Sequence, residues 1–207
     1  MMSKVFDTKK FHIVGNNLAL DLVNTVVAEN NSPKDLLEDF TDLLAWAVAA
    51  NLLEPTKARS LIRSRRVLRQ RSQVFSQSIH LRETLRQMVQ ALKNGQKVKA
   101  TIIDILNAIL GEKSGYTEIR KSENGFEKIF HIDFSEPHQL LIPIAESAAD
   151  LLCYANPAFI KKCEAVDCVL YFYDTTKNHS RRWCSMAACG NRAKAAAFYK
   201  RKKQLQN

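Results

Sequence analysis

Four cysteines near the C-terminus constrain the fold more than any other feature of this sequence. Cys163 and Cys168 enclose four residues, Cys184 and Cys189 enclose four more, and fifteen residues separate the two pairs. Two closely spaced pairs can place four sulfur ligands around one point, as tetrahedral zinc requires. The linker is long enough for a β-hairpin that returns the second pair to the first. The spacing predicts one structural Zn²⁺ per chain, and disulfides are the alternative.

The cellular compartment decides between these two readings of the cysteines. Residues 1–10 contain no apolar core of the signal-peptide type, and no run of 18 apolar residues is present. We therefore expect a cytoplasmic protein with no membrane partner, in a reducing environment that disfavours disulfides. Cys153 lies outside the pattern in an apolar stretch, and we expect it to be a small buried hydrophobe.

The net charge of +10 is distributed unevenly along the chain. Residues 1–56 carry −4, residues 57–93 carry +9, and residues 156–207 carry +8. Two basic blocks on an otherwise mildly charged chain indicate a polyanionic partner. For the block that begins at Lys57, the alternative is an exposed helix face that pairs with the acidic segment from Asp35 to Asp42.

The hydrophobic pattern predicts a mainly α-helical domain with a small β component over residues 1–155, followed by a zinc finger over residues 156–207. Ser32-Pro33 predicts a helix start, and Thr41 predicts the cap of the next helix. A long helical pattern runs from Thr56 to Lys93, weakens near Ser72 and stops at Asn94-Gly95. Further helices are expected over residues 101–110 and 140–154.

One β-hairpin is expected between these last two helices. Asn124-Gly125, flanked by residues 116–121 and 126–134, is a strong turn signal. Phe130, Ile132 and Phe134 alternate onto one face, which we expect to pack on the helices.

The finger itself predicts a treble-clef-like arrangement of a knuckle, a hairpin and a helix. Val169–Tyr173 is expected to be the first strand of the hairpin, which returns at Arg181–Trp183. Ser185 is expected to cap a helix that carries Cys189 in its first turns. Phe198 and Tyr199 interrupt the basic residues of this helix and are expected to dock it.

The finger and its helix supply the candidate nucleic-acid contacts. They are Arg181, Arg182, Asn191, Arg192, Lys194, Lys200, Arg201 and Lys202. Cationic side chains on a rigid helix suit phosphate contact, and Asn or Arg can read base edges. DNA is the expected partner and RNA is an alternative. The competing interpretations are a solvated helix end, internal ion pairs of the two arginines before Cys184, and hydrogen bonds from Asn191 to the knuckle.

Asp21, Asn24 and Thr25 are the candidate residues for a small-molecule effector. They could line a polar pocket in the larger domain, or they could only cap the local backbone. An enzyme is not expected, because the chain has no phosphate-loop, zinc-protease or nucleophile-elbow motif. Zinc held by four thiolates also keeps no position open for water.

The segment from Arg181 to Lys194 resembles the CGNR zinc-finger family, whose motif is met at Cys189-Gly190-Asn191-Arg192. Residues 163–168 and 172–175 also match that family. Residues 15–25 resemble the signature of the ABATE-type domain that precedes this finger, a largely helical domain with a few strands that is described as a stress-induced transcription regulator. The resemblance implies zinc ligation by the four cysteines, DNA binding and a bacterial regulatory role.

Two other functions stay open beside DNA binding. The finger could be a protein-interaction module, as many treble-clef fingers are. Alternatively, the larger domain binds a small molecule and the finger only stabilises it. The sequence leaves the oligomeric state open, and a homodimer is one arrangement.

Overall fold

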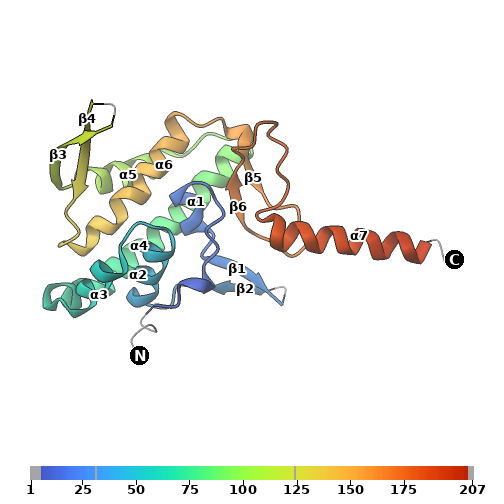
Figure 1. Cartoon of the computed structure of the whole chain (residues 1–207), viewed down its shortest axis with the longest axis horizontal. Coiled ribbons are helices and arrows are strands. Elements are labelled where there is room, and N and C mark those ends of the chain that lie inside the picture. Colours follow the sequence, from blue (N-terminus) through green and yellow to red (C-terminus); the bar gives the residue numbers. More distant parts are fainter. Residues whose placement is uncertain (1–5, 31, 124, 205–207) are drawn as a thin grey trace.

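The computed structural model describes residues 6–30, 32–123 and 125–204, without the side chain of Lys200. The predicted fold class is confirmed: the chain is mainly helical, with small two-stranded antiparallel hairpins (Figure 1). No helix in these ranges is long and apolar enough to cross a bilayer.

The N-terminal part begins with the 3₁₀ turn η1 (Thr8–Lys10), the short helix α1 (Leu18–Val23) and a hairpin of β1 (Val26–Glu29) and β2 (Ser32–Asp35). The helix start predicted at Ser32-Pro33 is therefore wrong. Proline fits β2 because each strand of a two-stranded ribbon has a free edge, where a missing N–H costs nothing.

Helices α2 (Phe40–Ala49), α3 (Pro55–Arg63) and α4 (Arg65–Lys93) follow. Asp39 caps α2, because its carboxylate accepts hydrogen bonds from the backbone N–H groups of Thr41 and Asp42; the cap predicted at Thr41 is wrong. The long helical pattern breaks at Ser64 rather than near Ser72. The predicted stop is confirmed, since Asn94 ends α4 and Gly95 takes a φ of +64°.

Helix α5 (Ala100–Gly111) leads into the predicted hairpin, formed by β3 (Gly115–Ser122) and β4 (Gly125–Ile132); Asn124 of the predicted turn lies outside the described residues. Its expected packing is only partly correct. Phe134, just after β4, packs on the core, but Phe130 is 42% exposed. The hairpin extends beside α5 and α6 instead of lying flat on them (Figure 1).

The turn η2 (Pro137–Leu141) and helix α6 (Ile142–Cys153) complete the helical part. Helix α1 packs between α4 and α6, and its apolar residues from Ala19 to Val23 are almost fully buried with Trp46 and Leu85. Cys153, in contrast, is exposed at the end of α6, so its expected burial is wrong.

The C-terminal part contains η3 (Pro157–Phe159), β5 (Ile160–Lys162), β6 (Tyr171–Tyr173), the π-helical turn η4 (Met186–Gly190) and helix α7 (Asn191–Gln204). The predicted strand at Val169–Tyr173 exists in its second half. Its partner is Ile160–Lys162, not Arg181–Trp183, so the hairpin encloses the first cysteine pair. Helix α7 points away from the rest of the protein (Figure 1).

Candidate metal centre and basic helix

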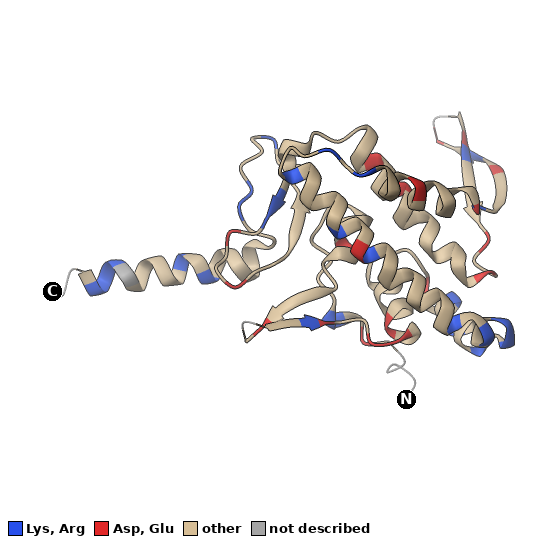
Figure 2. Ribbon diagram, turned by 180° about the vertical axis from the view of Figure 1, so that it is seen from behind, with Lys and Arg blue, Asp and Glu red and all other residues tan. Residues whose placement is uncertain are grey.

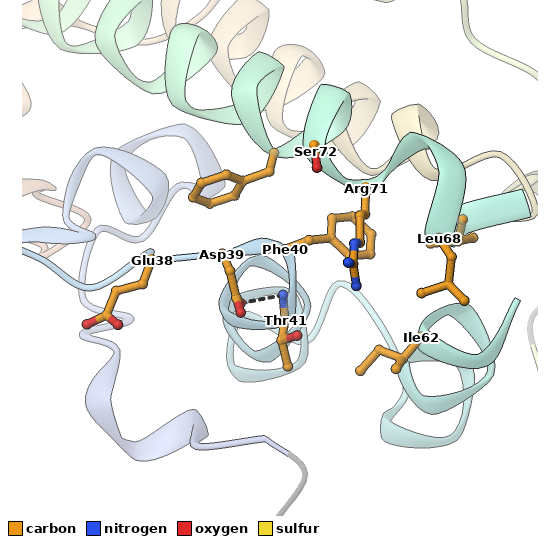
Figure 3. A pocket seen from close by; sticks show the side chains of 10 residues that line it. Glu38, Asp39, Phe40, Thr41, Ile62, Leu68, Arg71 and Ser72 are labelled. Atoms are coloured by element: carbon orange, nitrogen blue, oxygen red, sulfur yellow. Dashed lines mark hydrogen bonds between the residues drawn. The ribbon is translucent and has the colours of Figure 1, made fainter. Parts of the chain in front are cut away.

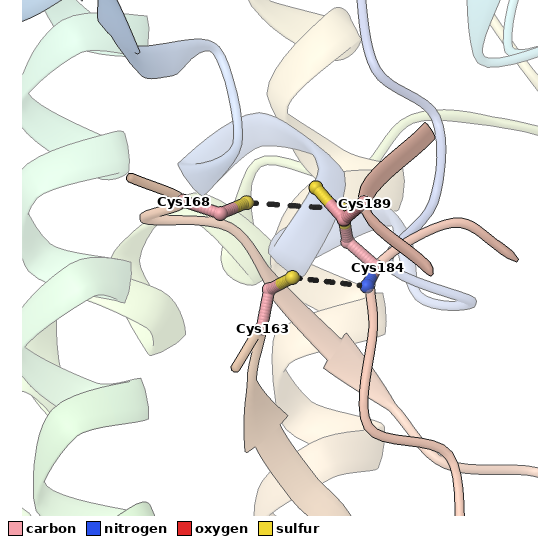
Figure 4. Close-up of side chains that lie close together, drawn as sticks. All are labelled: Cys163, Cys168, Cys184 and Cys189. Carbon is pink, nitrogen blue, oxygen red and sulfur yellow. Dashed lines mark hydrogen bonds between the residues drawn. The ribbon is translucent and has the colours of Figure 1, made fainter. Parts of the chain in front are cut away.

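The four cysteines converge on one point although they come from two separate loops (Figure 4). Their sulfur atoms all lie within 4.8 Å of one another. The Sγ of Cys184 lies 3.8 Å from that of Cys168 and 3.6 Å from that of Cys189. Tetrahedral zinc with Zn–S bonds of about 2.3 Å separates its sulfurs by about 3.8 Å, so these thiols fit the ion.

Local backbone geometry brings the two pairs together. The first pair occupies the turn between β5 and β6, where the N–H of Cys163 donates to Leu170 and that of Cys168 donates to Ala165. The second pair closes over it, because the N–H of Cys184 donates to the Cys163 sulfur at 3.3 Å. Cys189 lies in η4. Ser185 precedes this turn as predicted, but its side chain makes no capping hydrogen bond; the Gly190 N–H instead donates to its carbonyl.

The thiols are too crowded to ionise together without a cation. A hydrogen bond from Cys184 is the main cause that lowers the pKa of Cys168 to about 5. The same contact raises the pKa of the Cys184 thiol. A divalent ion between them would favour all four thiolates and remove this conflict. His179 does not belong to the cluster, since its ring stacks on Phe159 and its Nδ1 lies 3.0 Å from the Asp174 carbonyl oxygen.

Arg181, one of the candidate nucleic-acid contacts, has its side chain engaged inside the protein. Its guanidinium donates to the carbonyls of Val14, Trp183 and Cys184 and lies over the ring of Phe172. Its backbone N–H donates to the buried carboxylate of Asp174. The side chain thus ties the loop before Cys184 to the N-terminal segment.

Asp174 organises this loop, whereas the sequence had indicated it only as a possible partner of Arg181 or Arg182. Burial disfavours its charge, but hydrogen bonds from Lys161 and Thr176 outweigh that cost and hold its pKa well below the usual range. The Nζ of Lys161 lies 2.7 Å from Asp174 Oδ2 and also donates to the carbonyl of His179. The sequence signal was Asp174-Thr175-Thr176, an Asx-turn pattern directly after a strand.

The other candidate contacts near the metal differ in how freely they could reach a partner. Arg182 forms an exposed ion pair with Glu164 at 2.6 Å, and surface pairs of this kind exchange partners at little cost. Arg192 donates to the Cys189 sulfur at 3.2 Å. Asn191 donates to the carbonyl of Ala187, as the alternative interpretation expected.

Helix α7 carries the remaining candidates. Lys194, Arg201 and Lys202 are exposed. Figure 2 shows blue segments along this helix and no red ones. Phe198 and Tyr199 do not dock the helix as predicted, because they are 57% and 68% exposed and pack edge-to-face on each other. The helix therefore presents its cationic side chains without cover from the rest of the protein.

Asp21, Asn24 and Thr25, the candidate effector residues, have their polar side chains engaged inside the protein. All three are buried. Asp21 accepts from the N–H groups of Val14 and Gly15, Asn24 pairs with the backbone of Tyr171, and Thr25 donates to Leu22 and accepts from Arg82. The side chains of these three residues therefore make their hydrogen bonds to other groups of the protein.

A cleft that sequence reasoning missed lies between the N-terminus of α2 and the junction of α3 with α4 (Figure 3). Its volume is about 360 Å³. Phe40, Ile62 and Leu68 are among its apolar lining residues, Glu38 and Asp39 lie at one side, and Arg71 extends between Thr41 and Leu68. The acidic and basic segments thus face each other as expected, across a cleft. Arg82 pairs with Asp35 farther along α4.

Comparisons with protein families agree with this geometry. The model of ABATE, "Putative stress-induced transcription regulator", matches residues 16–155, and the model of the CGNR zinc finger matches residues 160–202. No curated protein matches the chain. The finger match contains all four clustered cysteines, which fit one structural zinc ion. Since the ABATE match alone spans more than half of the sequence, the chain belongs to the ABATE family and carries a CGNR zinc finger over residues 160–202.

Proposed function

We propose that this protein regulates transcription by binding DNA through its zinc finger and α7. The supporting observation is the continuity between the metal centre and the basic helix: Cys189 lies in η4, and α7 begins two residues later. The metal would fix the direction of α7, so its lysines and arginines are held in place before DNA arrives. The family description of a transcription regulator supports the same function.

Zinc would act structurally. Four protein thiolates complete its coordination, so its role is to hold η4 against the β5–β6 turn. Lys194, Arg201 and Lys202 would bind phosphates, while Arg182 could exchange Glu164 for a phosphate. Asn191 and Arg192, which contact Ala187 and Cys189, would orient the start of the helix.

The test is binding to mixed-sequence duplex DNA, followed by fluorescence anisotropy over a series of salt concentrations. Each phosphate contact contributes about −0.9 to the log–log slope. We expect the double variant Lys194→Ala/Arg201→Ala to flatten the slope by about 2 and to keep its zinc. The control variant Lys97→Ala/Lys99→Ala changes the net charge equally, at exposed sites outside the finger. Equal losses in both variants would overturn the assignment to α7.

The cleft between α2 and α4 supports a second candidate function, in which the helical part binds a small effector. A lining that combines apolar side chains with carboxylates at one side and Arg71 in the middle suits an amphiphilic molecule of a few hundred Å³. A thermal-shift screen of amphiphilic metabolites tests this function. Stabilisation that persists in Asp21→Asn but is lost in Arg71→Ala would support the cleft; stabilisation that survives Arg71→Ala would refute it.

A further inference from the structure

The junction of α3 and α4 concentrates positive charge. Residues 57–71 contain seven lysines and arginines and no Asp or Glu, and the next acidic residue along the chain is Glu83. Only Ser64 separates the two helices, so these cations gather at one end of α4. Figure 2 shows a group of blue segments there, at the opposite end of the molecule from α7. We call residues 57–71 the basic corner.

Part of this charge is matched inside the protein. Among residues 57–71, Arg66 alone forms an ion pair within the ranges that the structure describes, and its partner is Glu136. Arg71 lines the cleft that Glu38 and Asp39 also line. The acidic segment before α2 therefore faces only one edge of the basic corner.

Four other arginines of the corner lie next to like charges. Arg59 and Arg63 are four residues apart in α3, and Arg65 and Arg69 are four residues apart in α4. Because side chains at this spacing share one side of a helix, each of the two pairs repels itself. Arg65 also lies in the first turn of α4, where the helix dipole disfavours a cation. These arginines therefore oppose the stability of the free protein, and an anionic partner would relieve both effects.

The side chains around the arginines suit nucleic acid better than an acidic protein. Ser72, Gln73 and Ser76 continue the same side of α4 beyond the arginines and are exposed. Serine and glutamine donate hydrogen bonds to phosphates, as arginine does. Protein–protein interfaces instead centre on aromatic or apolar anchors. Leu68, the exposed apolar residue nearest to this side, lines the cleft.

The basic corner and the finger lie at opposite ends of α4 (Figure 1). This helix spans 29 residues, which corresponds to about 44 Å, and it contacts the finger through η3 and β5. Helix α7 extends still farther from the corner, along the long axis of the molecule (Figure 1). DNA has a persistence length of about 50 nm, so a duplex that crosses α7 cannot bend back to the corner.

We propose that the basic corner binds the phosphate backbone of a second DNA segment, so that one molecule holds two duplexes. This inference rests on the DNA binding proposed for the finger and adds a second surface with a bridging role. Arginine suits this contact because its planar guanidinium binds phosphate oxygens in a bidentate manner. The contact does not depend on sequence, since phosphates carry no base information.

A capture experiment with short duplexes tests this inference. A mixed-sequence duplex of about 12 base pairs is about 41 Å long, too short to occupy both surfaces at once. One copy is fixed to beads, and a labelled copy is added in solution with the zinc-loaded full chain. We expect wild type to capture the labelled duplex and Arg65→Ala/Arg69→Ala to capture at least about tenfold less.

Two controls show that such a loss is specific. The variant Lys97→Ala/Lys99→Ala removes the same charge at exposed sites after the other end of α4, and it should capture as much DNA as wild type. The melting temperature of Arg65→Ala/Arg69→Ala should stay the same or rise, because the substitution removes a repulsive pair from the free protein.

The outcomes separate this inference from the proposed function. If wild type captures no second duplex, or if the corner variant captures as much as wild type, the inference is wrong; in the latter case a dimer with one surface per chain explains the bridge. The salt slope on a single duplex decides separately whether the finger binds DNA. In Lys194→Ala/Arg201→Ala, which should bind through the corner alone, polyglutamate is compared with unlabelled duplex as a competitor. Equal displacement at the same concentration of charge would assign the corner to an acidic protein and overturn the inference.

Discussion

At the scale of single residues, polar side chains in and directly after α1 hold other segments of the chain against this helix. Asn24 is 1% exposed and exchanges two hydrogen bonds of 2.8 Å with the backbone of Tyr171. Asp21 uses one carboxylate oxygen, Oδ1, to accept from both Val14 and Gly15. The sequence left both an effector pocket and local backbone caps open here, because a polar group in an apolar segment does not reveal whether its partner is a ligand or a distant backbone.

Asp21 makes the stability of the protein depend on pH. Burial raises its pKa to about 6, despite the hydrogen bonds from Gly15 and Val14 and the charge of Arg181. The unfolded value is about 3.9. The folded state therefore holds the proton more tightly, and the contribution of Asp21 to stability falls as the pH rises from about 4 to about 6. Asp21→Asn keeps Oδ1 and removes this titration.

We expect the free energy of unfolding of Asp21→Asn, relative to wild type, to increase by about 2 kcal/mol between about pH 4 and pH 7. Urea denaturation of both proteins at the two pH values measures it. Loss of zinc at acid pH cancels in this comparison, because both proteins carry the same four cysteines. A constant difference between variant and wild type would show that Asp21 ionises normally in the folded chain.

At the scale of elements, sequence signals predicted the structure correctly where neighbouring residues determine it. Asn94-Gly95 ended α4 as predicted, because glycine takes positive φ without strain. Sequence signals gave the wrong structure where contacts between distant segments determine it. Ser32-Pro33 has the chemistry of a helix start, yet it pairs with β1. Tyr171–Tyr173 has strand composition, but only the fold decides that its partner precedes the first cysteine rather than following the loop.

The β3–β4 hairpin is an element whose pattern was predicted and whose packing was not. Ile119 and Phe126 lie on one face of it and are 74% and 79% exposed. Because they bury little surface, Phe126→Ala should change the free energy of unfolding by less than about 0.5 kcal/mol. Leu85→Ala, at a fully buried site in α4, should cost about 2–5 kcal/mol. Urea denaturation of the two variants checks this, and a large loss at Phe126 would mean that the hairpin is covered in solution.

At the scale of the whole molecule, the finger shares the core of the helical part. Ile160 and Tyr171 belong to the main hydrophobic cluster. The N–H of Tyr173 donates to Gly15 at 2.8 Å, and Arg181 donates to Val14. The cysteine spacing predicted the metal site because ligand chemistry is local. It carried no information on these contacts, which depend on residues more than 140 positions apart. A division of the chain at residues 155/156 remains a prediction.

Zinc removal should therefore destabilise more than the finger. Without the ion, the crowded thiols no longer hold η4 on the β5–β6 turn, and β6 loses support on the side that faces α1. Structural zinc contributes about 10–16 kcal/mol in small fingers, which exceeds the stability of many domains. We expect chelation, or Cys189→Ser, to lower the melting temperature of the whole chain in one cooperative transition. Circular dichroism at 222 nm, where the helices of residues 18–153 dominate, measures this transition.

The matched control is Cys153→Ser, at an exposed cysteine outside the cluster, which should retain both its zinc and its melting temperature. Two separate transitions, with the helical one unchanged by chelation, would instead support an independent finger at the predicted boundary.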